Sequence, residues 1–329
     1  MKIVYLIGNG FDLAQNLRTK YSHFYDECIL KKELSNDILV KLQKSIKSDI
    51  PSWADMEKRL GDFTSEMSTV QDVDDVYDFL KQELKNYLIN EQNKFAISST
   101  RTLLFQKRLT VPEISLPPES ADAIKKHING LTAGDKKCDI SVISFNYTDV
   151  FERAVAYNNK PVELVKREGD IAIKLNSISK VHGAVDREMV MGVADPEQIA
   201  NKQLASDIDA LDVLVKPRTT SLRRDFVCNR CVNLIGQADI IVMYGLSIGE
   251  TDRNWWKLVT DRIYSHQSTR LIIYGHLDDT IDPNDYPRIR REERKLYKKL
   301  YECNGTKNLQ FTRMDKQIFI SFNDELFHV

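Results

Sequence analysis

His182 is the residue of this chain whose side chain is best suited to proton transfer at neutral pH. The ordinary pKa of a histidine lies at about 6.5, so a neutral imidazole can accept a proton there. Gly183 follows directly, and the absence of a side chain lets a ligand approach closely at that point. A histidine can equally be a buried structural residue, and both interpretations of His182 stay open at this stage.

Asn146 and Asp12 carry polar groups that suit a sugar or an amide ligand. Asn146 follows an apolar run, and its side chain can both donate and accept hydrogen bonds. Asp12 follows a glycine turn, where a carboxylate could have a catalytic role. Each has a structural alternative: Asp12 could cap the next helix, and Asn146 could satisfy backbone groups of its own turn. Tyr147, beside Asn146, could pack or hydrogen-bond nearby.

Two glycine turns could hold a phosphate, because backbone N–H groups and the positive end of a helix dipole meet at such places. One turn follows the apolar run 3–7, and the other follows the run 239–244. The dinucleotide fingerprint needs a third glycine after the first turn, but Leu13 occupies that place. Asp252 stands near the start of the helix predicted after the second turn, where it could bind a ligand or cap that helix.

The elements that must position these residues are strands and helices in alternation. Apolar runs at 3–7, 138–145, 239–244 and 271–274 indicate buried strands, and helical spacing lies between them. This order predicts an α/β fold of the Rossmann-like type, with a mainly parallel sheet. Ligands bind beyond the carboxyl ends of such strands, so the polar motifs should converge there.

The remaining elements are predicted from spacing and composition. Helical spacing predicts a first helix over about 12–30 and an all-helical insertion over 35–137, where glycine is almost absent. Residues 1–34 and 138–329 then form the nucleotide-binding domain. Weaker strand patterns are found at the following places: 162–165, 179–182, 189–193 and 309–322.

The overall composition restricts the class of protein. The chain has 329 residues and a formal net charge of −1, which argues against a general nucleic-acid binder. Its five cysteines are scattered and odd in number, which favours reduced thiols and a cytoplasmic protein. The apolar run at 3–7 is too short for a signal peptide core, and no run approaches the about 20 residues of a membrane helix.

Two other patterns have simple interpretations. Cys228 and Cys231 could form half of a zinc site, but no second pair accompanies them, so no metal is expected. The basic run 288–299 alternates with acidic residues and is predicted to be a solvated helix face.

Five motifs, in this order, resemble the AbiH family of bacterial abortive-infection proteins: GNGFDLAQNLRTKYSHF, WADME, SFNYTD, HG followed by GVAD, and GLSIGETD. The resemblance covers the chain from residue 3 to about residue 274. It implies a role in defence against bacteriophage, for which a phage-derived trigger and a homo-oligomer are possible partners.

The order of glycine turn, strand with Asn, strand with His-Gly and strand with Gly-x-Ser is also similar to sirtuin-type (SIR2-like) NAD-consuming domains. This similarity implies that the first turn holds a pyrophosphate, Asn146 lies near the nicotinamide ribose and His182 is the general base. It implies catalytic roles for His182, Asn146 and Asp12, and nucleotide contacts from Gly8, Asn9, Gly10, Phe11, Tyr147, Gly183, Gly245, Ser247 and Asp252. The paired CxxC motifs of the deacetylases are absent from the sequence, which leaves cleavage or binding of NAD or a related nucleotide.

Three functions therefore stay open. The first is an enzyme that resembles an NAD glycohydrolase. The second is a module that senses a nucleotide without turnover and switches the helical insertion or an oligomer. The third is a metal-dependent nuclease or other hydrolase toxin, which would require the following carboxylates to converge: Asp12, Asp149, Asp195 and Asp252.

Overall fold

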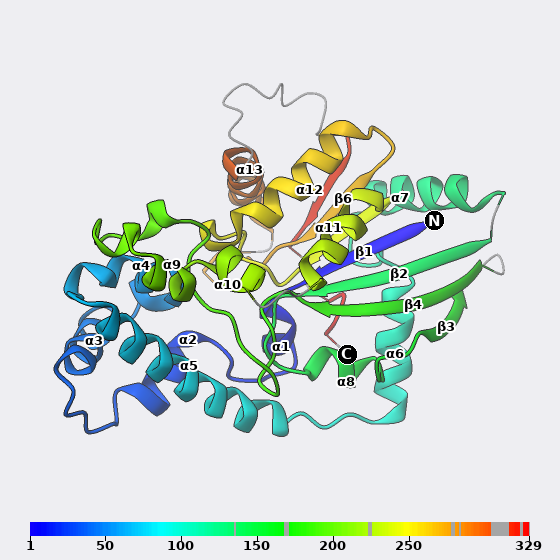
Figure 1. Ribbon diagram of the computed structural model, residues 1–329. Helices are drawn as coiled ribbons and strands as arrows, with labels where there is room; N and C mark the ends of the chain where they lie inside the picture. The colour runs from blue at the N-terminus through cyan, green and yellow to red at the C-terminus, as the bar shows by residue number, and fades with distance from the viewer. Residues whose placement is uncertain are drawn as a thin grey trace.

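The computed structural model describes residues 1–134, 136–167, 171–222, 226–277, 280–282, 284–303, 316–322 and 325–328. Its centre is a seven-stranded sheet in the order β3-β4-β2-β1-β5-β6-β7 (Figure 1). Neighbouring strands are parallel, except that β3 is antiparallel to β4. The strands are β1 Lys2–Ile7, β2 Lys137–Ser144, β3 Val162–Arg167, β4 Ile171–Lys180, β5 Ile240–Tyr244, β6 Arg270–Tyr274 and β7 Ile318–Ser321. The predicted α/β fold with a mainly parallel sheet is confirmed.

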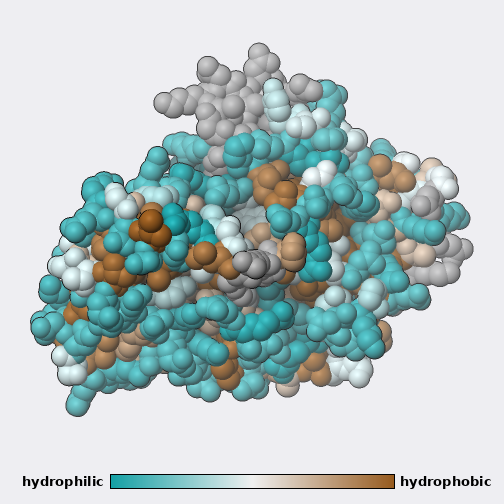
Figure 2. All heavy atoms as spheres, viewed as in Figure 1, coloured by the Kyte–Doolittle hydropathy of each residue, from teal (hydrophilic) through white to brown (hydrophobic). Residues whose placement is uncertain are grey.

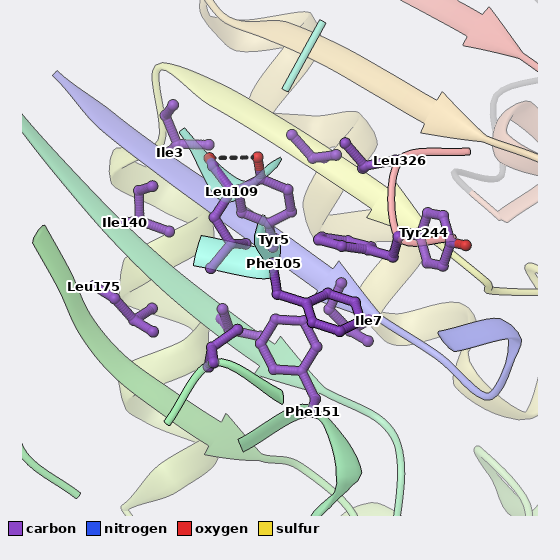
Figure 3. Packing of buried hydrophobic residues seen from close by; sticks show 14 of the residues in the cluster. Ile3, Tyr5, Ile7, Phe105, Leu109, Ile140, Phe151, Leu175, Tyr244 and Leu326 are labelled. Atoms are coloured by element: carbon purple, nitrogen blue, oxygen red, sulfur yellow. Dashed lines mark hydrogen bonds between the residues drawn. The ribbon is translucent and has the colours of Figure 1, made fainter. Parts of the chain in front are cut away.

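β1 is buried on both faces, because side chains of successive strand residues point to opposite sides of a sheet. Ile3, Tyr5 and Ile7 enter one core, in which α6 (Ser99–Leu109) and α7 (Pro118–Thr132) cover the sheet. Figure 3 shows this core, including the hydrogen bond of 2.8 Å that the Tyr5 hydroxyl donates to the Leu109 carbonyl. Val4 and Leu6 enter the opposite core with α11 (Val227–Gln237), α12 (Arg253–Ser265) and α13 (Tyr286–Cys303).

A third core lies in a mostly helical region, residues 21–93 and 185–222, which we call the helical lobe. Figure 1 shows this lobe beyond the carboxyl end of β1, with α10 beside α9 and nearer to the sheet than α9. Its helices are α2 Tyr21–Phe24, a π-helical turn Tyr25–Ile29, α3 Asp37–Ser48, α4 Met56–Phe63, α5 Val70–Asn93, α9 Ile208–Leu214 and α10 Lys216–Leu222. Short 3₁₀ helices accompany them at Ser52–Ala54, Thr64–Glu66, Pro196–Gln198 and Leu204–Ser206.

The region predicted as an insertion, 35–137, is divided between two packing units. Its helices α3, α4 and α5 belong to the helical lobe, whereas α6 and α7 cover one face of the sheet. The lobe also includes residues 185–222, which are far away in the sequence. The helical lobe is therefore built from two separate segments of the chain.

The single helix predicted over 12–30 is wrong. α1 spans only Gly10–Ala14, and the chain turns at Asn16, whose φ of 61° is left-handed, before α2 begins. Asparagine tolerates this conformation better than most residues. The side chain of Gln15 donates to the Phe327 carbonyl at 2.9 Å, which ties the turn to the C-terminal part of the chain.

The strand predicted at 189–193 is also wrong, because this segment lies in the helical lobe with a single isolated bridge between Val193 and Val215. β4 ends at Lys180, two residues before the predicted end of that strand. The tail contributes β7 at the edge of the sheet, while residues 309–315 of the predicted tail strands lie outside the described residues.

The basic run 288–299 lies on α13, where exposed ion pairs join Arg290 to Glu293 and Lys295 to Glu292. This confirms the predicted solvated helix face. Figure 2 shows hydrophilic side chains over most of the visible face of the molecule. None of the described helices has the length and apolar character that crossing a membrane requires.

Candidate functional site

The polar motifs meet at the carboxyl ends of four neighbouring strands. β2 lies on one side of β1 and β5 on the other, so the strand order reverses beside β1. Ligands in open α/β sheets bind at such a reversal. Asp12, Asn146, His182 and Asp252 follow β1, β2, β4 and β5 respectively.

The two glycine turns pack directly against each other. Gly8 N–H donates to the Tyr244 carbonyl at 2.9 Å, and Gly10 N–H donates to the Gly245 carbonyl at 3.0 Å. A Cβ atom on Gly10 would lie 2.4 Å from the Gly245 Cα atom, and Gly245 has a φ of +66°. Only glycines allow this contact between backbones. Phosphate binding by Gly8 and Gly10 stays a prediction, and their N–H groups already have partners within the protein.

Asn9 and Phe11, the other predicted nucleotide contacts at this turn, also have partners within the protein. The Asn9 side chain donates to the Thr19 carbonyl at 3.0 Å and accepts from the Thr19 hydroxyl at 2.6 Å. The Phe11 side chain is fully buried between the rings of Phe105 and Phe151. The position of Phe11 therefore fits a core residue, and the predicted nucleotide contact does not agree with its burial.

Asp12 is buried within α1 and does not cap that helix. Asn146 Nδ2 donates to Asp12 Oδ1 at 3.0 Å, and the Thr148 hydroxyl donates to Asp12 Oδ2 at 2.5 Å. Burial raises the pKa of Asp12 to about 6, although the hydrogen bond from Thr148 acts in the opposite direction. A carboxyl group with such a pKa changes its charge near neutral pH, as a group in acid–base chemistry must.

Lys180, which the sequence did not single out, fixes the segment that carries Asn146. Its ammonium group donates to the backbone carbonyls of Asn146 and Thr148 and pairs with Glu152 at 3.0 Å. Because Lys180 is the last residue of β4, it ties the end of β4 to the chain after β2.

His182 belongs to a group of ionisable residues, Glu57, Lys216, Asp252 and His182, which we call the charged cluster; all are buried except Asp252, whose side chain is 19% exposed. His182 Nε2 lies 3.0 Å from Asp252 Oδ1. The Lys216 ammonium donates to the same Asp252 oxygen at 2.7 Å and to Glu57 Oε2 at 2.9 Å. One cation therefore joins the two carboxylates, and one of these carboxylates contacts the imidazole.

Burial and charge act against each other in the charged cluster. Burial alone would raise the pKa of Asp252, but Lys216 and His182 together hold it well below its usual value. Burial raises the pKa of Glu57, and Lys216 offsets only part of that rise. For Lys216 the two carboxylates outweigh burial, so its pKa lies above the ordinary range. Asp252 and Lys216 are therefore both charged at neutral pH.

The turn after β5 directs Asp252 into the charged cluster. Asp252 ends the 3₁₀ helix Glu250–Asp252 before α12, and its side chain makes no capping hydrogen bond to that helix. Ile248, in the same turn, is buried with a φ of 52°, which a β-branched residue rarely adopts. Such strain costs about 1–3 kcal/mol and is found most often at functional sites. Ser247 is exposed, and its carbonyl accepts from Lys299 at 3.0 Å.

Gly183 allows the chain after His182 to fold back. Its φ is +76°, and a Cβ atom there would lie 1.7 Å from the Glu188 carbonyl oxygen. The returning chain donates a hydrogen bond of 2.9 Å from Val190 N–H to the His182 carbonyl. Gly183 is therefore needed for the turn that buries His182, and a ligand contact at this glycine stays a prediction.

Two members of the charged cluster, Glu57 and Lys216, come from the helical lobe, and the sequence did not predict either. Glu57 lies in the first turn of α4, where Asp55 caps the helix by accepting from Lys58 N–H at 3.1 Å. Lys216 is held by Val193, whose carbonyl accepts from Lys216 N–H at 3.0 Å. The WADME motif contains Glu57 and was a usable signal, whereas no motif surrounds Lys216.

The segment 145–148 joins Asp12 to the charged cluster. Asn146 and Thr148 face Asp12, while the Tyr147 hydroxyl donates to the Val190 carbonyl at 2.9 Å and lies 3.4 Å from Glu57 Oε1. The ring of Phe145 meets the His182 ring edge-on, with centroids 5.5 Å apart. The predicted catalytic residues thus lie in two groups that this short segment joins, with Asp12 and Asn146 in one and His182 in the other.

The carboxylates that a metal site would need do not gather at one point. Asp149 lies 3.6 Å from Arg153, and Asp195 pairs with Arg253. In the part of the chain that the structure describes, no three His, Cys, Asp or Glu side chains are placed to share a metal ion. The nuclease alternative, which required four converging aspartates, has no support in this arrangement.

Comparison with known proteins gives one informative result. No curated protein matches the chain. The family model of the bacteriophage abortive infection protein AbiH matches residues 4–274, which include the helical lobe, Asp12 and the whole charged cluster. Because this match covers most of the 329 residues, the chain belongs to the bacteriophage abortive infection AbiH family.

Proposed function

We propose that this protein is an abortive-infection enzyme that hydrolyses the N-glycosidic bond of NAD or a related nucleotide. The observation that carries the proposal is the 3.0 Å contact between His182 Nε2 and Asp252 Oδ1. It lies where the strand order reverses, next to the segment that holds the buried Asp12. A histidine oriented by a carboxylate is a common general base.

His182 would act as the base that activates water. Asp252 Oδ1 lies 3.0 Å from Nε2, so an Nε2–H tautomer would face the ionised carboxylate and Nδ1 would be the acceptor. Water oxygen would attack C1′ of the ribose while its proton passes to Nδ1. The C1′–N bond breaks, and nicotinamide leaves as a neutral base with the bonding electron pair. General-base assistance of this kind contributes about 10²–10⁴-fold to the rate.

Asp12 and Asn146 would stabilise the ribose as positive charge develops on it. An ionised Asp12 supplies the negative charge, and a fixed charge in a buried site acts more strongly than in water. Asn146, whose amide is oriented by Asp12 at 3.0 Å, would orient the ribose. A pKa of about 6 means that most of Asp12 is ionised at pH 7.

The test is loss of NAD and related nucleotides, followed by chromatography of the released base. Purified protein, from both resting and phage-infected cells, is compared with His182→Ala and with the exposed control His266→Ala. We expect turnover to fall by about 10²-fold or more in the first variant and to stay unchanged in the control. Equal turnover by His182→Ala, or no consumption by either wild-type preparation, would refute the enzyme.

A second candidate function, nucleotide sensing without turnover, is favoured by one specific observation. The Lys216 ammonium, from the helical lobe, donates to Asp252 Oδ1, which follows β5 of the sheet, at 2.7 Å. A nucleotide bound at this contact could therefore change the position of the lobe relative to the sheet. An intact nucleotide that stays bound through purification, identified by mass spectrometry, together with no turnover, would support this function over the enzyme.

A further inference from the structure

We propose that Lys216 is a positioning residue that sets the proton arrangement of His182 through Asp252, so that the base is formed only when the helical lobe is seated on the sheet. The catalytic meaning of this inference rests on the function proposed above. The contacts themselves, and the state of the imidazole that they impose, can be measured without any substrate.

A single oxygen of Asp252 serves both partners. Its Oδ1 atom lies 2.7 Å from the Lys216 ammonium and 3.0 Å from His182 Nε2. Lys216 is 5% exposed and His182 is 7% exposed, so water has little access to these contacts. The ammonium balances the charge of the carboxylate, so an imidazole whose Nε2 lies beside this oxygen can stay neutral.

Removing the Lys216 ammonium changes which protonation state of the His182 imidazole is favourable beside the Asp252 carboxylate. A buried carboxylate without a counter-charge is strongly unfavourable, and His182 is the other group in contact with Asp252 that can supply a positive charge. An imidazolium carries protons on both nitrogens and cannot accept a further proton. Loss of the Lys216 ammonium is therefore expected to convert His182 from a base into an acid.

The helical lobe supplies this cation. Lys216 begins α10, and its backbone is fixed by Val193 of the same lobe at 3.0 Å. Its second carboxylate, Glu57, also belongs to the lobe, whereas Asp252 and His182 follow strands of the sheet. Figure 1 shows α10 between α9 and the carboxyl ends of the strands. Moving the lobe away would therefore break the 2.7 Å contact and leave His182 without its base form.

The experiment is nitrogen NMR of the full-length protein labelled at histidine, with the His182 signals assigned by their loss in His182→Gln. In the wild type at pH 7 we expect a neutral ring with the proton on Nε2. In Lys216→Met we expect the imidazolium pattern and a fall in nucleotide hydrolysis of about 10²–10⁴-fold. The matched control is Lys58→Met, an exposed lysine of the lobe that pairs with Glu250 at 3.2 Å; it should keep the wild-type pattern.

Two further variants separate this inference from misfolding. Glu57→Gln keeps the Lys216–Asp252 contact and should keep the neutral ring. The double variant Glu57→Gln with Lys216→Met removes one negative and one positive charge together, and we expect it to fold with the imidazolium pattern. A neutral ring protonated on Nε2 in a folded variant lacking Lys216 would overturn the inference. The imidazolium pattern in these variants, combined with no hydrolysis by the wild type, would support the positioning role and refute the proposed enzyme.

Discussion

Replacing Asp12 with asparagine should stabilise the protein at pH 7. The buried carboxylate is costly when it is ionised, and asparagine has nearly the same shape without the charge. The asparagine oxygen can still accept from Asn146. Its amide can donate to the Thr148 hydroxyl, which then acts as the acceptor. Both contacts of Asp12 are therefore retained after the substitution.

The size and sign of the effect follow from the pKa of Asp12. A rise from 3.8 to about 6 corresponds to about 3 kcal/mol, because one pKa unit is worth about 1.4 kcal/mol. Between these two values the folded state holds a proton that the unfolded state has lost. The free energy of unfolding of the wild type therefore falls as the pH rises through this window and is level above it. The advantage of Asp12→Asn should grow from near zero at about pH 4 to about 3 kcal/mol at pH 7.

The assay is urea unfolding followed by tryptophan fluorescence at several pH values from 4.5 to 7.5. The control is Asp261→Asn, whose exposed carboxylate pairs with Lys257, and its difference from the wild type should stay within about 0.5 kcal/mol at every pH. The reasoning is wrong if the difference in free energy of unfolding between Asp12→Asn and the wild type does not change with pH. It is also wrong if Asp12→Asn is less stable than the wild type at pH 7. Loss of nucleotide hydrolysis in this more stable variant is expected if Asp12 serves catalysis.

Two further predictions concern packing and charge. Gly10→Ala should lower the free energy of unfolding by about 1–3 kcal/mol in urea titrations, because its Cβ atom would meet the Gly245 backbone. Gly130→Ala, in α7 with open space around the new Cβ atom, should instead raise it by about 0.5–1 kcal/mol, and equal effects of the two would contradict the packing of the turns. Lys216→Met should lower the free energy of unfolding by about 3–5 kcal/mol, since it removes the lysine that pairs with Glu57 and Asp252. Lys58→Met, which breaks an exposed pair, should cost about 1 kcal/mol or less in the same titration, and similar losses in both would refute the buried pairing.

The half of the site that follows the strands could be predicted from the sequence. The apolar runs of β1, β2, β5 and β6 identify buried strands almost to the residue. The carboxyl ends of neighbouring parallel strands lie at one edge of the sheet, so Asp12, Asn146, His182 and Asp252 had to be near one another. Alternation along the segment 145–148 then decides which of these side chains meet.

The half that the helical lobe supplies could not be predicted in this way. Helical spacing identifies the buried face of α4, but it does not say which element that face meets. Lys216 reaches Asp252 because the Val193–Val215 bridge brings two distant segments together, and no local pattern encodes that bridge. The break of the first helix has a similar cause, because Phe11, Ala14 and Leu17 recur at steps of three residues although the chain turns at Asn16.

Three unfavourable features lie at the strand ends, and together they argue for function there. Asp12 is buried with a raised pKa, Ile248 has a strained backbone, and Lys216 is buried between two carboxylates. Asp12 and Ile248 could be replaced singly by asparagine and glycine, and Lys216 could be replaced together with its two carboxylates by apolar side chains, in each case giving a more stable protein with the same fold.

A hollow of about 380 Å³ elsewhere on the lobe provides a contrast. It is lined by Asp212, Pro217, Arg218, Ser221 and Leu222. Its ion pair, between Arg218 and Asp212, is partly exposed, so keeping it there costs the fold little. The presence of a hollow would by itself direct attention to this part of the lobe. The concentration of costly residues directs it to the strand ends, because a fold keeps several destabilising features in one place only where their chemistry is used.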